Sequence, residues 1–214
     1  SLYFGGGTPS LLNEESFKEL FSELQTSRLW VVGSNEATAP IIEASYKRFL
    51  QQLEDLLSVN SFLFGSRPSS ADYAIFGQLV ALTGFDPTPR AIAHKISPRI
   101  IAWQDLMEDM GGLDPQEDDW MSYEAAQEHL VDIFKEVGKV YLPALLANAK
   151  AISAKEKTWT AEIDGTQWEQ RSFPYQAKCL QCINDEFNTL NKDDQNQIMP
   201  FLKKTGCEDL IEKD

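Results

Sequence analysis

The sequence predicts a mainly α-helical protein with one β-hairpin near residues 157–171, and three observations support this. Apolar residues recur at three- and four-residue spacing over several long stretches, as in helices that bury one face. Only one stretch alternates with period two, and it surrounds Asp164-Gly165, a strong signal for a tight hairpin turn. The composition, with 43% hydrophobic and 24% charged residues, is typical of a globular protein.

The first elements predicted are a short strand, a glycine loop and two helices. Leu2–Phe4 is apolar and runs into three glycines, which predicts a strand followed by a tight loop. A helix is predicted over 14–25, and a second over 39–57 with Thr38 as its cap. The apolar stripe of the second helix consists of Ile42, Tyr46, Phe49, Leu53 and Leu56.

The next stretch, SFLFGSRPSSADYAIFGQLVALTG, contains a capping box. The Ser69 hydroxyl is expected to bond the amide of Asp72, and the Asp72 carboxylate to bond back to the amide of Ser69. The helix that follows is apolar almost all round, which predicts a central helix with no exposed face. Gly84 and Pro87 are expected to end it.

The remaining elements are five helices and the hairpin. In the hairpin, a two-residue turn sets Ile163 opposite Thr166 and Ala161 opposite Trp168, with Trp159 diagonal to Trp168 on the same face. The stretch DPQEDDW, residues 114–120, is expected to be a loop. Helices are predicted over 98–110, 122–138, 141–152, 175–190 and, in a shorter form, 198–202.

The middle of the chain resembles the C-terminal helical domain of the glutathione S-transferase family. FLFGSRPSSADYAIFGQL matches that family's apolar run, glycine, polar turn and Ser/Thr-x-x-Asp opening of a buried helix, and SPRIIAW resembles its next helix. VYLPALLANAKA, the tryptophan hairpin, FPYQAKCL and TGCEDL resemble bacterial members with a long tail. The resemblance implies a helical domain over 28–152 and a hairpin plus helical tail over 153–214.

This resemblance implies a function for the parent protein rather than for the chain alone. The family joins glutathione, its co-substrate, to small electrophiles, and its helical domain shapes the electrophile pocket, for which Tyr46 and Tyr73 are candidates. Core packing is the other interpretation of both tyrosines. The family's thiol-activating residue lies in a thioredoxin-like domain of about 80 residues, whereas only 27 residues precede the match. The expectation is therefore a chain with no catalytic residue and no bound cofactor, inactive alone.

The alternative is a non-catalytic interaction module, since helical domains of this family also serve as docking units. In this family the first long helix helps to form both the dimer interface and the wall of the site. Here residues 14–25 stand where that helix is expected, so homodimerisation depends on them. In this family Ser69 and Asp72 have a folding role and not a catalytic one.

The first 27 residues resemble a different family. Gly5, Gly6, Gly7, Thr8 and Pro9 match the Gly-Gly-Gly-Thr-Pro motif of radical S-adenosylmethionine enzymes related to oxygen-independent coproporphyrinogen III oxidase. In that family the motif approaches the methionine end of the cofactor, and three cysteines upstream hold an iron–sulfur cluster. The cysteines here are Cys179, Cys182 and Cys207, which do not match that spacing. The interpretation is a chimeric or truncated chain joined near Ser27-Arg28.

Charge and cysteine content restrict partners and compartment. A net charge of −14 disfavours nucleic acid, whose phosphates it would repel. No apolar run is long enough for a membrane span, and no secretory leader is recognised. Three cysteines are too few for a disulfide framework, so the sequence favours the cytoplasm.

Several smaller motifs have a structural and a functional interpretation. Cys179-x-x-Cys182 is half a zinc site, but two packed structural cysteines are the favoured interpretation. His94 and His129 are interpreted as ordinary surface histidines. The acidic stretch 114–119 lacks the glycine and closing glutamate of a calcium loop. No metal site is predicted.

Overall fold

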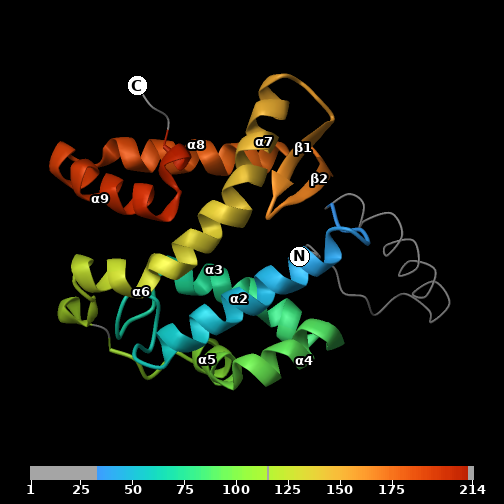
Figure 1. Ribbon diagram of the computed structural model, residues 1–214. Helices are drawn as coiled ribbons and strands as arrows, with labels where there is room; N and C mark the ends of the chain where they lie inside the picture. The colour runs from blue at the N-terminus through green and yellow to red at the C-terminus, as the bar shows by residue number, and fades with distance from the viewer. Residues whose placement is uncertain (1–32, 115, 212–214) are drawn as a thin grey trace. The chain divides into compact units, whose positions relative to one another are not determined.

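The computed structural model describes residues 33–114 and 116–211. In this part of the chain helices dominate, and the only sheet is one two-stranded antiparallel hairpin (Figure 1). The prediction of a mainly α-helical protein with a single hairpin is therefore confirmed. The strand at Leu2–Phe4, the loop Gly5–Pro9, the helix over 14–25 and the junction near Ser27-Arg28 all lie outside the described residues.

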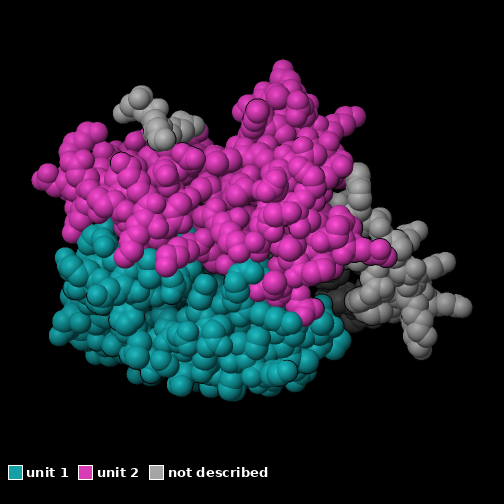
Figure 2. Space-filling model, viewed as in Figure 1, with its two compact units in different colours: residues 1–3, 45–134 teal, residues 4–44, 135–214 magenta. Residues whose placement is uncertain are grey.

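The chain divides into two compact units (Figure 2). The first, called the helical unit here, contains residues 45–134. The second, the hairpin unit, contains the described residues 33–44 and 135–211. The compact units thus separate at 134/135, and the boundary near 152/153 between a helical domain and a tail stays a prediction.

The helical unit is built from helices joined by short connections. In it, α3, α4 and α5 pack on one another. Its buried core includes Leu50, Leu53, Phe62, Leu79, Ile100 and Trp103. The elements are α2 (Ala39–Leu57, within this unit from Ser45), α3 (Ser70–Gly84), α4 (Pro87–Ile96), α5 (Pro98–Glu108), the 3-10 turn η2 (Glu117–Asp119) and α6 (Tyr123–Glu136), whose last two residues belong to the next unit.

Helix α4 was not predicted from the sequence, because Pro87 was interpreted only as the end of the preceding helix. α3 does end at Gly84, but Pro87 then begins α4. Asp86 caps α4, since its Oδ1 accepts a hydrogen bond from the amide of Thr88 at 3.1 Å. A proline in the first turn costs no helical hydrogen bond, so the same residue stops one helix and starts another.

The prediction that α3 has no exposed face is wrong. Leu79 and Thr83 are buried, and the Thr83 hydroxyl donates to Gln104 Oε1 of α5 at 2.8 Å. Tyr73, however, is 50% exposed, and Gly77 has open space where a Cβ would stand. The exposed positions of α3 are Tyr73 and small or polar residues, which leave little apolar area to cover, so the apolar composition did not require burial on every side.

The hairpin unit packs a long helix against the hairpin and a second helix. α7 contacts both β1 and α8. The core of this unit includes Ala151, Trp159 and Ile163. The predicted register is confirmed, with Ala161 opposite Trp168 and Ile163 opposite Thr166. The elements are the π-helical turn η3 (Val137–Tyr141), α7 (Leu142–Ser153), β1 (Thr158–Ile163), β2 (Thr166–Arg171), α8 (Pro174–Thr189), α9 (Lys192–Thr205) and the 3-10 turn η4 (Glu208–Leu210).

The expected break between two helices near Gly138 is a π-helical turn instead. The amide of Leu142 donates to the carbonyl of Val137, five residues back, so α6 continues into α7. Gly138 lies so close to the carbonyls of Thr205 and Gly206 that a Cβ there would stand 2.5 Å and 2.8 Å from their oxygens. The glycine therefore permits close packing within the hairpin unit rather than ending a helix.

The last helix is longer than predicted. α9 spans Lys192–Thr205, although Pro200 stands inside it. Asn191 Oδ1 accepts from the amide of Asp194 at 2.9 Å and caps its start, and Gly206, at φ 71°, ends it. The polar caps set the ends, and both ends lie beyond the short apolar run from Ile198 that predicted this helix.

Candidate functional site

At the start of α3, two residues that the sequence predicts to form a capping box, Ser69 and Asp72, are hydrogen-bonded to each other. The Ser69 amide donates to Asp72 Oδ2 at 2.8 Å, and the Asp72 amide donates to Ser69 Oγ at 3.3 Å. Both hydrogen bonds of the predicted capping box are present. The Ser69 hydroxyl also donates to the same carboxylate oxygen at 2.6 Å.

Asp72 does more than the capping pattern predicts. Its side chain is fully buried, and its second oxygen, Oδ1, accepts from the amide of Leu63 at 2.9 Å. Burying a polar group is costly unless hydrogen bonds satisfy it, and these N–H and O–H groups satisfy both oxygens of the carboxylate. One side chain thus fixes both the start of α3 and the strand-like segment before it.

That segment is in turn joined to the acidic loop. Gly65 pairs with both Phe62 and Trp120, and its φ of 130° is one that residues with a side chain rarely adopt. A Cβ at Gly65 would collide with the carbonyl oxygen of Asp119. Glycine in the FLFG run is therefore required by backbone conformation and by close approach together.

Tyr46, one of the two pocket candidates, is half-buried on α2. Its hydroxyl donates to the carbonyl of Pro89 in α4 at 3.3 Å. Burial, followed by the negative charge of Asp86, raises the pKa of Tyr46 from 10.0 to about 12. The phenol is therefore neutral at physiological pH, and its proton is already engaged.

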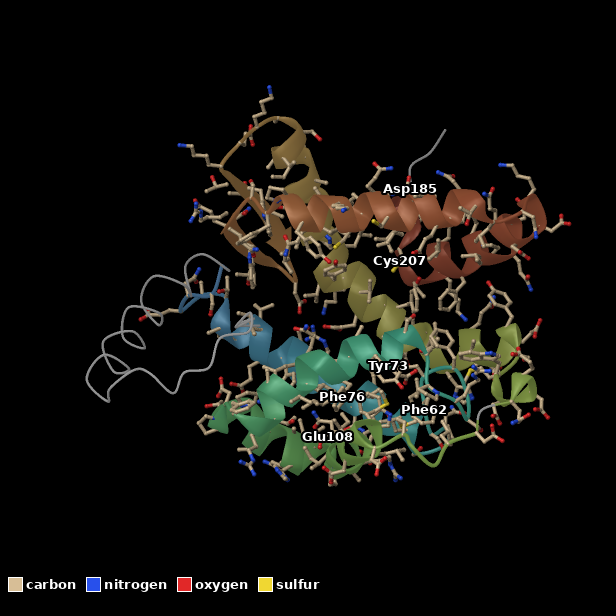
Figure 3. The ribbon with its side chains drawn as sticks, turned by 180° about the vertical axis from the view of Figure 1, so that it is seen from behind. Phe62, Tyr73, Phe76, Glu108, Asp185 and Cys207 are labelled. Carbon is tan, nitrogen blue, oxygen red and sulfur yellow. The ribbon has the colours of Figure 1, made fainter. Side chains whose placement is uncertain are left out.

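Tyr73, the other candidate, has a different environment. Figure 3 labels it on α3, where half of its side chain is exposed. The structure joins Ser69 to Asp72 and Tyr46 to Pro89, but no hydrogen bond joins the two tyrosines among those of the described residues. The two pocket candidates are thus not brought into one bonded group.

A polar cluster that the sequence analysis missed connects α2 to the start of α5. Ser97 is fully buried, and its hydroxyl donates to Glu54 Oε2 at 2.6 Å. Arg99 Nε lies 3.2 Å from Glu54 Oε1 and forms an ion pair with it. Since these residues are more than 40 positions apart in the sequence, periodicity along one helix cannot reveal the cluster.

The acidic loop carries a second unpredicted contact. The Arg67 guanidinium lies 4.5 Å from the centre of the Trp120 ring and donates to the carbonyl of Gln116 at 3.2 Å. It also lies 3.7 Å from Glu117, whose side chain is solvent-exposed. Asp119 caps the 3-10 turn by accepting from the Gln116 amide at 2.6 Å. The carboxylates here shape a solvated loop, as predicted.

The two histidines and the possible metal ligands are the remaining candidates from the sequence. His94 and His129 are both exposed, which agrees with their interpretation as surface residues. Across the described ranges, no group of three or more His, Cys, Asp and Glu side chains could hold a metal ion. Within the same ranges, no helix has both the length and the apolar character needed to cross a membrane.

Comparisons with protein-family models, with curated proteins and with solved structures found no match to this chain.

Proposed function

We propose that residues 33–211 are the helical, electrophile-pocket part of a glutathione S-transferase-like protein and do not themselves activate glutathione. The observation that carries this proposal is the capping box of Ser69 and Asp72. Its reciprocal bonds stand at the start of a helix that follows an apolar run and a glycine, in the order that the resemblance describes. The buried carboxylate and its bond to Leu63 favour a built structural element over a chance match of four residues.

The state of Tyr46 supports the absence of thiol activation. A hydroxyl that stabilises a thiolate must donate its proton to the sulfur. The Tyr46 proton is donated to the Pro89 carbonyl, and a pKa of about 12 disfavours its loss. The described residues form helices and one hairpin, so no thioredoxin-like sheet is among them. Tyr46 then serves as a wall residue and not as a base.

A conjugation assay tests the catalytic half of the proposal. The full chain is mixed with glutathione and a chromogenic aryl halide, and the initial rate is measured as the glutathione concentration is raised. We expect the rate to equal that of the spontaneous reaction at every concentration. A rate that saturates with glutathione and is lost on heating the protein would show that this chain is itself an enzyme.

A binding assay tests the pocket half. The aryl halide is titrated without glutathione, and tryptophan fluorescence is followed for the wild-type chain and for Tyr46→Phe. Saturable binding with a changed dissociation constant in Tyr46→Phe is expected. If binding does not saturate, the helical unit has no electrophile pocket, whatever the conjugation assay gives.

A second candidate function is a non-catalytic docking module that binds a second copy of the chain. The observation that favours it is the exposure of two aromatic side chains, Tyr73 at 50% on α3 and Phe85 at 84% just beyond its end. Light scattering of the wild-type chain and of a Tyr73→Ser, Phe85→Ser variant tests it. A wild-type dimer that the variant converts to a monomer is expected under this function, whereas a wild-type monomer contradicts it.

A further inference from the structure

Two cysteines lie one turn apart on the same face of α8. Cys179 and Cys182 are three residues apart, so the rise between them is about 4.5 Å and their side chains are neighbours on the helix surface. Cys179 is half-buried and Cys182 is exposed. The prediction of two packed structural cysteines is therefore wrong for Cys182, and both thiols lie within reach of solvent.

Neither of these two cysteines is a buried position of α8. The buried position of this helix is Asn184, whose Nδ2 donates to the carbonyls of Leu180 and Leu210. The third cysteine, Cys207, is fully buried beyond the end of α9, and burial raises the pKa of its thiol (Figure 3). Cys207 has the properties of a packed cysteine, whereas Cys182 is exposed and Cys179 is only half-buried.

Helix geometry does not favour a disulfide between the pair. Residues three apart on an α-helix have Cβ atoms about 5–6 Å apart, whereas a disulfide needs a Cβ–Cβ distance of about 3.5–4.5 Å. An ion with metal–sulfur bonds of about 2.3 Å separates two sulfur atoms by up to about 4.6 Å. An atom inserted between the sulfurs therefore fits the undistorted helix better than a direct bond between them.

The number of ligands selects the kind of ion. Zinc takes four ligands in structural sites, but in the part of the chain that the structure describes no third His, Cys, Asp or Glu completes a metal-binding group. Two thiolates alone suit a soft ion that accepts low coordination, and Cu(I) is the usual biological one. We propose that Cys179 and Cys182 form a surface dithiolate site for one ion of the Cu(I) class.

The surroundings are compatible with such a site. Tyr175 lies one turn before Cys179 on α8 and is exposed, and Tyr141, which is also exposed, lies close to Cys179. All four residues belong to the hairpin unit. Binding joins both sulfurs to the ion and releases one proton from each thiol, with no change of oxidation state. The site is independent of the function proposed above.

Competition with a chelator tests the site. Cu(I), held as its coloured complex with bicinchoninate under anaerobic conditions with ascorbate, is titrated with the full reduced chain. We expect the wild type to withdraw one equivalent of Cu(I) per chain. Cys179→Ser and Cys182→Ser should each lower the affinity by roughly 100-fold or more, because even outer-shell partners of a metal site are worth about 10- to 100-fold. Cys207→Ala should bind as the wild type does.

A matched variant separates a bridging site from thiols in general. The double variant Gln181→Cys, Cys182→Ser keeps an exposed thiol but moves it about 200° around the helix from Cys179, and circular dichroism verifies that it is folded. It should withdraw no tightly bound equivalent. The proposal is overturned if this variant binds as tightly as the wild type, if the wild type withdraws no Cu(I), or if the Cys179→Ser, Cys182→Ser chain withdraws as much as the wild type.

Discussion

Three buried polar side chains serve as substitutes for backbone partners in this chain. Asp72 accepts from the amides of Leu63 and Ser69, and Asn148 exchanges two hydrogen bonds with the backbone of Phe173, at 2.9 Å and 2.7 Å. Asn184 donates to two carbonyls. Asp72 and Asn148 satisfy backbone groups outside the regular helices and strands, and Asn184 reaches the carbonyl of Leu210 at the end of η4. Replacing one of these side chains leaves its backbone partners unsatisfied and so lowers the free energy of unfolding.

Loss of the Asp72 carboxylate should therefore be among the costlier single changes in the helical unit. Asp72→Ala removes charge-assisted bonds and leaves two buried or partly buried amides unsatisfied, so we expect the free energy of unfolding to fall by roughly 3 kcal/mol. Urea titration followed by circular dichroism measures it. Asp119→Ala is the matched control, because Asp119 makes the same bond to an amide three residues back but on the exposed loop. A loss of only about 0.5–1 kcal/mol is expected there, and equal losses in the two variants would contradict the role given to burial.

The Tyr46 phenol should ionise late when the pH is raised. Because its folded pKa is raised from 10.0 to about 12, the neutral form is favoured in the folded state. Its contribution to stability is fully present below pH 10 and is lost as the pH rises from about 10 to about 12. Absorbance near 295 nm is read milliseconds after a pH jump, before the protein unfolds, and is plotted against the final pH. The plot should show a titration step near pH 12 that Tyr46→Phe removes. If the same step remains in Tyr46→Phe, it belongs to another tyrosine.

At the scale of elements, two helical glycines should respond to alanine with opposite sign. A Cβ at Gly138 would meet the backbone oxygens of Thr205 and Gly206 at 2.5 Å and 2.8 Å, and a backbone cannot move aside as a side chain can. Gly138→Ala should destabilise by about 1–3 kcal/mol. Gly77→Ala, in α3, meets nothing within 4 Å and should stabilise by about 0.5–1 kcal/mol through helix propensity. Thermal unfolding of the two variants measures the difference, and a stabilised Gly138→Ala would show that the π-helical turn is not packed as described.

The elements predicted correctly from the sequence are those with a strong local signal. The helix over 39–57 and the hairpin register follow from apolar periodicity and from Asp164-Gly165, and the structure has both. Helix α4 was missed because a proline signal has two meanings, and only the cap at Asp86 distinguishes them. The π-helical turn was missed because Gly138 serves a contact with residues almost 70 positions away. Local signals contain no information on such contacts.

The candidate site follows the same division. The reciprocal bonds of Ser69 and Asp72 were predicted because both partners lie within four residues. The bond to the amide of Leu63, nine residues before Asp72, could have been inferred only from the apolar run that contains Leu63. The bonds of Glu54 to Ser97 and Arg99 join residues far apart in sequence, so no local sequence pattern predicts them. The exposure of Cys182 likewise depends on which face of α8 packs inward.

At the scale of the whole molecule, the excess of negative charge dominates the electrostatics. The chain has 33 Asp and Glu against 19 Lys and Arg, which gives a net charge of −14. Ion pairs such as Lys139–Asp164 at 2.7 Å and Arg99–Glu54 at 3.2 Å offset only part of the repulsion, since each lies partly in solvent. A protein with this excess of one sign is destabilised by its own field in the folded state, where the charges are held closer together than in the unfolded chain.

Added salt should therefore stabilise this protein. Raising NaCl from about 10 mM to about 200 mM shortens the Debye length from about 30 Å to below 10 Å and screens repulsion between distant carboxylates more than attraction within close pairs. The melting temperature should rise by about 2–4 °C, the shift that about 1 kcal/mol produces in a chain of this size. Differential scanning calorimetry at neutral pH measures it, and a repeat near the isoelectric point of about 4.5 is the control, because net repulsion vanishes there. A fall in melting temperature with salt at neutral pH would mean that close ion pairs, and not the excess of carboxylates, dominate the electrostatics of the folded chain.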